Sequence, residues 1–525
     1  MAKKVQIITI DSILGGFSPT FTLSGSDQYL DGIGIDPEGI GSSGGITGKS
    51  LGGIMPTFGS AILSNSTLGE APMWITGSPN TTGVFVYGSG GTMHALGNVG
   101  FGPVDGGVVK PASGAGNGMV AYNDYIYLAT PTDIYRYGRV SQTAPTLASW
   151  WVTGLTNSAL VNSDYPATRS VTYPNHVLHF HNDGRVYVAD YDNATGDSPH
   201  GGLIHWFKTS TDGTGGTSAF SALVLPPNFM PTALETYGTD LAILCSPQAS
   251  YSSGSIPKTG NSALFLWDTI SQNYYRHVPI KEALATAMKV KNGEIFILAG
   301  NMDASVKLMK YLGGESFQTL ATIYDGSPPP QCAVEIFGDM IGWGGHVTTP
   351  LAAAGLFTYG SRSGQLKPSL HMPMRIRDTS NTFPIVSSVK SIERTNYPWI
   401  GWRTDATTTY GLDRITNGGT QASRWRTKVF NIGKEFIIRR IRIPLTNAIS
   451  AGDSIVSTVY IDTEAKTSGL RTINSTNFPN SERLIDLNSL NITGYSNFYI
   501  DFAFSGTNQK GFSFPITIEL EVHEL

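Results

Sequence analysis

The sequence predicts an all-β protein: a β-propeller of about seven blades, with an extended N-terminal arm and a C-terminal antiparallel β-sandwich. Three observations lead to this prediction: the composition, a repeated pair of short strands, and a change of strand pattern near residue 417. The 525 residues include 61 glycines, and 14% of them are charged while 40% are hydrophobic. Because ordinary domains contain about 7% glycine and about 25% charged residues, this composition excludes a helical bundle or coiled coil. The apolar share is sufficient for a large core.

Residues 1–65 are expected to form the arm. They contain the glycine pairs Gly15-Gly16, Gly44-Gly45 and Gly52-Gly53, and one strand-like run from Val5 to Ile10. Such a segment cannot bury enough surface to fold alone, so it lies either on its own chain or on a neighbouring subunit. The residues Gly48-Lys49-Ser50 are similar to the end of a phosphate-binding loop, but Ser43 stands where that loop needs its first glycine.

Residues 66–416 repeat one pattern, which predicts the propeller. An Asn-, Asp- or Gly-rich turn precedes a short apolar strand, and a second strand with an aromatic residue near its end follows. The starts of the first strands lie 42 to 60 residues apart, close to the roughly 50 residues of a kelch-class blade. The alternative is a set of sandwich domains with chance spacing. The first strands are 84–87, 126–128, 186–188, 241–244, 295–298, 340–343 and 399–402, and five second strands follow at 134–137, 203–206, 264–267, 308–311 and 356–359.

Two details extend this assignment. A helix-like stretch from Lys281 to Val290 is expected to be an insertion between blades. The two cysteines, Cys245 and Cys332, fall in the fourth repeat and at the start of the sixth. Because these repeats are not adjacent in a ring, the cysteines should lie beyond the roughly 7 Å reach of a disulfide, and two free thiols are predicted.

Residues 417–525 carry longer strands with cleaner alternation, which predicts an antiparallel sandwich. The strands are 436–445, 455–462, 498–504 and 516–522; in the last, Ile516, Ile518, Leu520 and Val522 are expected to face a core. Basic residues gather at the start of this unit and are the candidate contacts with a partner, with solvated edge residues as the alternative. They are Arg424, Arg426, Lys428, Arg440 and Arg442, together with Arg439.

The sequence offers no convincing catalytic or metal-binding motif, so we expect a protein that is not an enzyme and holds no cofactor or metal. Asp190, Asp192 and Asp197 place three carboxylates in one turn, but their spacing departs from that of calcium loops, and a hairpin turn is the alternative. His176, His179 and His181 are too few for a zinc site without further partners. The segment Ser210 to Gly213 approaches the Asp-box of bacterial sialidases in a single copy.

Composition and aromatic residues bear on the partners. The net charge of −4 is too balanced to predict nucleic-acid binding. No run approaches 18 apolar residues, and no signal-peptide core follows Met1, so neither membrane insertion nor export is expected. Four tryptophans could stack on sugars, although Trp399 and Trp402 should point to opposite faces, so that at least one lies in the core. The four are Trp150, Trp151, Trp399 and Trp402.

The layout of arm, propeller and sandwich resembles the virion structural proteins of tailed bacteriophages. Two stretches carry the resemblance: the arm residues from Ile10 to Phe17, and the segment from Trp425 to Phe430 with its continuation to Ile443. The resemblance implies a non-enzymatic virion component of the tail or adsorption apparatus. It would assemble with its own copies and other virion proteins, and possible partners include a receptor or glycan on the host surface. The alternative is a glycan-binding or glycan-cleaving propeller.

The resemblance also leads to an expectation about the arm. If the arm docks on an adjacent subunit through backbone pairing, deletion of residues 1–60 should abolish assembly and leave the propeller folded.

Overall fold

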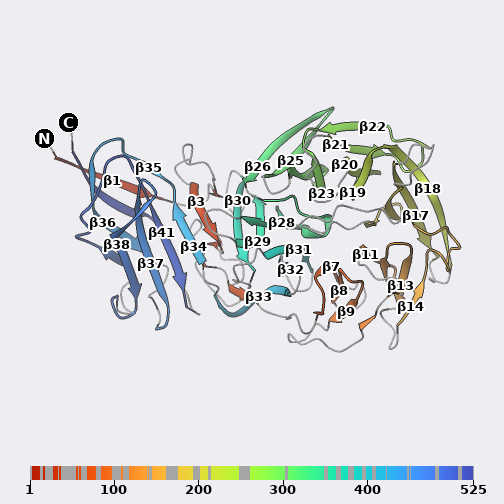
Figure 1. Cartoon of the computed structure of the whole chain (residues 1–525), viewed down its shortest axis with the longest axis horizontal. Coiled ribbons are helices and arrows are strands. Elements are labelled where there is room, and N and C mark those ends of the chain that lie inside the picture. Colours follow the sequence, from red (N-terminus) through yellow and green to blue (C-terminus); the bar gives the residue numbers. More distant parts are fainter. Residues whose placement is uncertain are drawn as a thin grey trace.

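A computed structural model gives the structure of the chain (Figure 1). It describes residues 3–11, 16–17, 28–33, 35–36, 55–56, 58–60, 68–77, 84–96, 108–109, 111, 117–138, 140, 145–160, 176–192, 201–210, 215–247, 261–301, 305–324, 326–347, 353–361, 368–376, 384–392, 398–404, 409–420, 423–445, 449, 451–478, 484–506, 511–512 and 514–523.

Seven four-stranded antiparallel sheets form the larger unit, a seven-bladed β-propeller, which confirms the predicted fold class. Blade 1 consists of β7 (Pro72–Gly77), β8 (Val84–Gly88), β9 (Met93–Leu96) and β10 (Val108–Val109), and blade 2 of β11 (Gly118–Tyr122), β12 (Tyr125–Ala129), β13 (Ile134–Gly138) and β14 (Thr146–Ser149). Blade 3 consists of β15 (Leu178–Phe180), β16 (Val186–Tyr191), β17 (Gly201–Thr209) and β18 (Gly216–Pro227), and blade 4 of β19 (Phe229–Tyr237), β20 (Asp240–Pro247), β21 (Ser262–Trp267) and β22 (Arg276–Ile280). Blade 5 consists of β23 (Leu284–Lys291), β24 (Glu294–Asn301), β25 (Ser305–Gly313) and β26 (Ser316–Tyr324), and blade 6 of β27 (Val334–Phe337), β28 (Met340–Val347), β29 (Ala353–Gly360) and β30 (Ser369–Arg375). Blade 7 consists of β31 (Pro384–Ser391), β32 (Pro398–Thr404), β33 (Tyr410–Thr420) and β6 (Phe58–Ser60).

The first strand of each blade lies toward the centre of the ring. β11 contacts both β7 and β15, β23 contacts both β19 and β27, and β31 contacts β7, so that the ring closes between blades 7 and 1. The seven apolar strands found in the sequence are the second strands of the blades, and the five aromatic strands are third strands. Their turns use the expected residues, because Asn123, Asn292 and Gly338 have φ of 51°, 52° and 55°.

The expected helix at Lys281 to Val290 is wrong. Residues from Leu284 onward form β23, the first strand of blade 5, which pairs with β24 from Leu284↔Gly300 to Lys291↔Glu294. Alanine, methionine and lysine favour helices in isolation, but that preference is weak. Here the tight turn at Asn292-Gly293 brings β24 alongside, and the pairing buries Leu284 to Met288.

The fourth strand of blade 7 comes from the N-terminal part of the chain. β6 pairs antiparallel with β33, with Ser60 opposite Ile415 and Phe58 opposite Thr420. Because the other three strands of this blade lie more than 300 residues later, the ring is closed by hydrogen bonds between two distant parts of the sequence.

The smaller unit is the predicted sandwich, made of two sheets whose strands pair antiparallel except for Gly16–Phe17, which pairs parallel with Gln28–Ile33. One sheet has the order β1 (Lys3–Ile10), β42 (Ile516–His523), β36 (Phe436–Pro444) and β39 (Leu484–Leu487), with β40 (Ile492–Gly494) also on β36. The other has the order β2 (Gly16–Phe17), β3 (Gln28–Ile33), β34 (Ser423–Thr427), β41 (Asn497–Ser505), β37 (Ser454–Ile461) and β38 (Glu464–Asn474), with β35 (Phe430–Asn431) on β41. Ile516, Ile518, Leu520 and Val522 lie in one core with Phe498, Ile500 and Phe502, as their alternation predicts.

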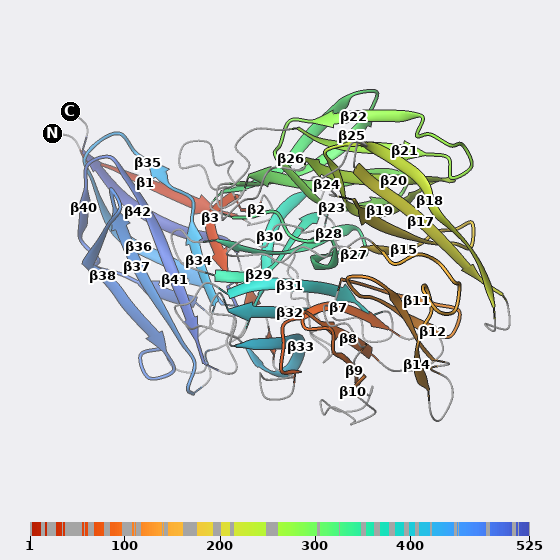
Figure 2. The same ribbon diagram turned by 45° about the vertical axis from the view of Figure 1, so that its right-hand side comes forward.

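The described part of residues 1–65 is built into its own chain. β1 pairs with β42 along all eight of its residues, and β3 pairs with β34. β2 and β3 also contact β30 of blade 6, so they lie between the two units (Figure 2). Deletion of residues 1–60 would remove β1 from the sandwich and β6 from blade 7. We therefore expect the deletion to destabilise both units. The sequence alone suggested that it would leave the propeller folded.

Both cysteines are buried free thiols, as predicted. Cys245 lies in β20 of blade 4, and Cys332 lies in the short 3-10 helix η2 (Gln331–Ala333) that precedes β27 of blade 6.

The role of β1 in the sandwich can be tested with two isoleucines of the same strand. Ile10 is 5% exposed and packs in the sandwich core, whereas Ile7 is 64% exposed. Ile10→Ala should lower the free energy of unfolding of the sandwich by about 2–5 kcal/mol, because it removes buried methyl groups. Ile7→Ala should change it by less than about 0.5 kcal/mol. Denaturant unfolding of the full chain measures both, and equal effects would show that β1 is not packed as described.

Candidate functional site

The first strands of all seven blades surround a cavity of about 280 Å³ in the central channel. β7, β11, β15, β19, β23, β27 and β31 each contribute lining residues, and η2 contributes Gln331 and Cys332. The cavity opens to solvent beside Phe180 and Lys390, which are 43% and 36% exposed. Central channels of rings are common ligand sites because several elements can aim side chains at one point.

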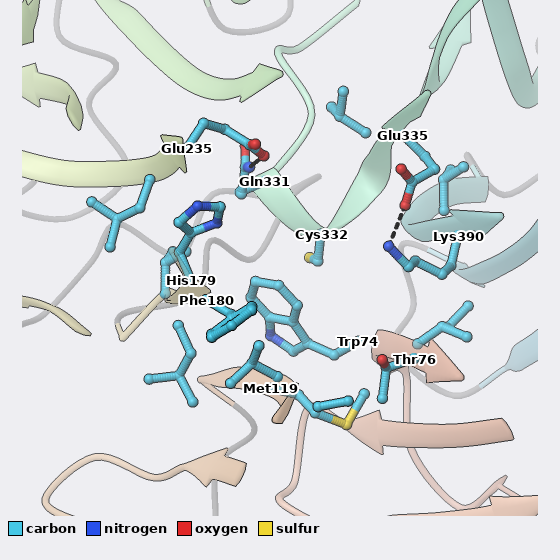
Figure 3. A pocket seen from close by; sticks show the side chains of 18 of the residues that line it. Trp74, Thr76, Met119, His179, Phe180, Glu235, Gln331, Cys332, Glu335 and Lys390 are labelled. Atoms are coloured by element: carbon cyan, nitrogen blue, oxygen red, sulfur yellow. Dashed lines mark hydrogen bonds and ion pairs between the residues drawn. The ribbon is translucent and has the colours of Figure 1, made fainter. Parts of the chain in front are cut away.

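Four charged side chains of alternating sign follow one another around blades 4 to 7. Glu235, Lys289 and Glu335 occupy the same register in their blades, each two residues before the pair that closes the first hairpin. Lys289 Nζ of blade 5 lies 2.7 Å from Glu235 Oε1 of blade 4. Lys390 Nζ of blade 7 lies 2.5 Å from Glu335 Oε2 of blade 6 (Figure 3).

Gln331 and the backbone complete this polar side of the cavity. Gln331 Nε2 donates to Glu235 Oε1 at 3.0 Å, and its Oε1 accepts the backbone N–H of Met288 at 2.8 Å. Burial alone would lower the pKa of Lys289, but Glu235 and Glu335 together raise it. Burial alone would raise the pKa of Glu335, but Lys289 and Lys390 hold it below its usual value. The two glutamates and the two lysines thus form two ion pairs, and their charges sum to zero.

The opposite side of the cavity, from blades 1 to 3, is mostly apolar. Trp74, Met119 and Phe180 lie on this side, facing Glu235, Gln331 and Glu335 across the cavity (Figure 3). The indole N–H of Trp74 is buried and has no hydrogen-bond acceptor among the described residues. His179 Nε2 lies 2.8 Å from Thr236 Oγ1. Burial lowers the pKa of His179 to about 4, so its ring is neutral at pH 7.

The cavity is poorly equipped for catalysis. Burial raises the pKa of the Cys332 thiol, which donates to the backbone oxygen of Ser387 at 3.3 Å, so no thiolate nucleophile forms there. Thr236 and His179 have the spacing of a nucleophile and a base. In the part of the chain that the structure describes, however, no carboxylate hydrogen-bonds to the other ring nitrogen of His179, and a pKa of about 4 makes a weak base.

The basic residues proposed from the sequence are paired within the sandwich and do not form one site. Arg424 and Arg426 both bind Asp501, with Arg424 Nε 2.8 Å from Oδ1 and Arg426 Nη2 3.0 Å from Oδ2. In the other sheet, Arg440 Nε donates to Asp486 Oδ1 at 2.6 Å, and Arg442 Nε lies 3.7 Å from Asp486 Oδ2. The hydrogen bond from Arg440 lowers the pKa of Asp486.

The remaining member of that set and one neighbour are also engaged locally. Lys428 Nζ lies 5.6 Å from the centre of the Phe430 ring. Arg439 donates to Glu521 Oε2, at 2.9 Å from its Nε. These contacts are the internal pairings expected of basic residues on the strands of a small domain. A partner protein that bound these residues would have to compete with their existing bonds.

Asp190 and the histidines of blade 3 make contacts in the protein interior. Asp190 is fully buried, with Oδ1 3.4 Å from His176 Nδ1 and Oδ2 3.1 Å from His205 Nε2. His181 Nδ1 accepts the backbone N–H of Asp183. Among the described residues, no group of three or more His, Cys, Asp or Glu side chains could hold a metal ion. Asp197, Asp212 and Gly48-Lys49-Ser50 lie outside the described residues.

The tryptophans expected to stack on sugars are buried. Trp150, Trp151, Trp399 and Trp402 are 3%, 0%, 4% and 7% exposed, because each packs within or between blades. The sequence reasoning missed the cavity residues, but a signal for three of them exists. Glu235, Lys289 and Glu335 each stand three residues before the turn residue Gly238, Asn292 or Gly338, so a fixed spacing marks one position of each blade.

No protein-family model matches the chain, and no curated protein is similar to it in sequence. Among solved structures, the chain is similar to the WD40 domain of Neurospora crassa Pan2, at 8% identity over 67% of this chain and 91% of that one, with a TM-score of 0.38. It is also similar to the Cps50 (Swd1) β-propeller domain of Myceliophteria thermophila, at 9% identity over 66% and 97%, with a TM-score of 0.40.

A third similar structure is an exo-β-1,3-galactanase from Phanerochaete chrysosporium, at 8% identity over 69% of this chain and 97% of that one, with a TM-score of 0.27. Within the described residues, no helix is long and apolar enough to cross a membrane.

The ion pair between blades 4 and 5 can be tested by a double-mutant cycle. Glu235 and Lys289 are 12% and 18% exposed, so Lys289→Met leaves a largely buried carboxylate without its partner. We expect it to lower the free energy of unfolding of the propeller by up to about 3 kcal/mol, and the double variant with Glu235→Gln to recover most of this loss. The matched control is Lys466→Met, which removes a surface pair with Glu464. Additive effects in the cycle would contradict the coupling.

Proposed function

We propose that the protein is a non-enzymatic structural component of a phage virion, belonging to the tail or adsorption apparatus, whose copies associate through the sandwich. The single observation that carries the proposal is the outer edge of β1. β1 is the end strand of its sheet, and its pairing with β42 runs through eight residues without a bulge. Val5 and Ile7 are 63% and 64% exposed on this strand. Among the described residues, no strand pairs with its outer edge.

A long, flat edge strand with apolar side chains favours pairing with another chain. Natural proteins often protect such an edge with a bulge, a proline or charged side chains, lysine in particular. β1 begins with Lys3 and Lys4, and Lys3 Nζ lies 2.6 Å from Glu521 Oε1 of the same chain, but the run from Val5 to Ile10 has no bulge, proline or charge. The edge therefore supports assembly as the role of this unit. The sequence suggested that a free N-terminal arm mediates assembly. In this proposal the assembling element is β1, which is a strand of the sandwich.

A second copy of the chain is the occupant that the sequence of β1 favours. An antiparallel pair keeps outer residues opposite outer residues. With Ile7 opposite Ile7 of the second copy, Lys3 lies opposite Asp11 at both ends of the pair. The contact is thus complementary in charge at its ends and apolar in its middle, as a two-fold contact between identical chains requires.

The cavity supports the non-enzymatic part of the proposal. Its charged residues are paired with one another, its thiol is protonated, and its histidine is a weak base. These features stabilise a ring and do not supply a nucleophile. The resemblance of layout to tailed-phage proteins supplies the virion setting.

The virion role can be tested on particles. Antibodies raised against the purified chain should label the tail region of tailed-phage particles that encode it, in immunogold electron microscopy. Mass spectrometry of the same purified particles should find the chain at a fixed ratio to the other virion proteins. Recovery of the chain only in the particle-free fraction, or turnover of chromogenic glycosides by the purified protein, would contradict the proposal.

The assembly edge can be tested with one substitution at each end of the same sheet. Ile7→Lys places a charge in the middle of the β1 contact and should shift the purified protein to a smaller species in size-exclusion chromatography with light scattering. Leu484→Lys is the matched control, because Leu484 is 49% exposed on β39 at the opposite edge. It should leave the mass unchanged. A monomeric wild-type protein, or an equal effect of both variants, would contradict pairing through β1.

A further inference from the structure

We infer that the central cavity is a binding site for an uncharged saccharide. Three observations carry the inference: the unpartnered indole N–H of Trp74, the charge balance of the cavity, and its division into a polar and an apolar side. The inference goes beyond the virion role and does not depend on it.

Five tryptophans have a buried indole N–H with no acceptor among the described residues, and Trp74 is the one of these five that lines the cavity. Trp74 is 9% exposed, lines the cavity, and its Nε1 has no acceptor among the described residues. A buried N–H without an acceptor costs free energy. A ligand oxygen in the cavity could accept this hydrogen bond. Tryptophan is also the side chain best suited to pack against the apolar face of a sugar ring.

The charge balance selects an uncharged ligand. Glu235 and Glu335 are neutralised by Lys289 and Lys390, and His179 is neutral because burial lowers its pKa to about 4. The cavity therefore has no excess charge to attract an anion or a cation. A charged ligand would have to break an existing pair to be matched, whereas an uncharged ligand leaves both pairs intact.

The polar side offers donors and acceptors together. A carboxylate has about four acceptor positions and an ammonium group three donors. Glu235 uses one oxygen for Lys289 and Gln331, and Lys390 donates to Glu335. The groups therefore retain hydrogen-bonding capacity of both kinds on one wall, which suits hydroxyl groups because each can donate and accept.

The volume of the cavity limits the size of the saccharide that it can hold. Ligand pockets usually measure roughly 300–1,000 Å³, and this cavity of about 280 Å³ lies just below that range. It suits a single terminal sugar residue, entering from the open side near Phe180 and Lys390.

The test begins with the full-length protein on an array of neutral and sialylated glycans. We expect binding to neutral glycans, followed by calorimetric titration of the best soluble monosaccharide or disaccharide from that array. Trp74→Phe keeps an apolar ring and removes the N–H, and should weaken binding about fivefold. Lys390→Ala, at the exposed rim of the cavity, should also weaken binding and serves if Trp74→Phe does not fold.

Two further variants separate a ligand site from a structural role. Glu335→Gln leaves the cavity with one excess positive charge, so it should shift the array profile toward sialylated glycans, which a purely structural residue would not do. Tyr495→Ala removes an aromatic side chain that is 67% exposed in the sandwich and should bind as wild type does.

The inference is overturned if the wild-type protein binds no neutral glycan, or if the cavity variants keep the wild-type affinity and profile. Failure of the particle labelling with glycan binding intact would overturn the virion role alone.

Discussion

Closure of the seven-bladed ring is the constraint on which the rest of the structure depends. Blade 7 is completed by β6, so the ring is held by hydrogen bonds between residues 58–60 and β33. Without β6, the outer edge of β33 in blade 7 would be left unpaired. The same N-terminal segment supplies β1, β2 and β3 to the sandwich. Folding of the two units is therefore coupled through one segment that has no core of its own.

The cavity follows from that closure. Each blade contributes its first strand, and Glu235, Lys289 and Glu335 stand at one register position on successive blades. Contacts between the first strands of neighbouring blades bring them side by side. Buried charges are costly unless they are paired, and the alternation of sign from blade 4 to blade 7 satisfies this condition. Blades 1 to 3 meet the same space with Trp74, Met119 and Phe180, which gives the cavity its apolar side.

The sequence predicted the elements whose signal is local. The strands near Val186 and Ile295 and the alternation from Ile516 to Val522 were found because apolar spacing and turn residues lie within a few positions. The helix expected at Lys281 to Val290 failed because pairing with β24 outweighs a weak helical preference. The sugar-stacking role of Trp150 and Trp399 failed because burial depends on neighbouring strands. Trp74 was missed for the same reason.

The sequence by itself determined an all-β chain, the repeated strand pair of the blades and the alternation of the sandwich. Each of these depends on the order and spacing of nearby residues. The tertiary structure alone decided that β6 closes blade 7, that Asp501 and Asp486 pair with the basic residues, and that Trp74 shares a cavity with Glu235 and Lys390. These contacts join residues far apart in the chain, and a single sequence carries no local signal for which distant partners will meet.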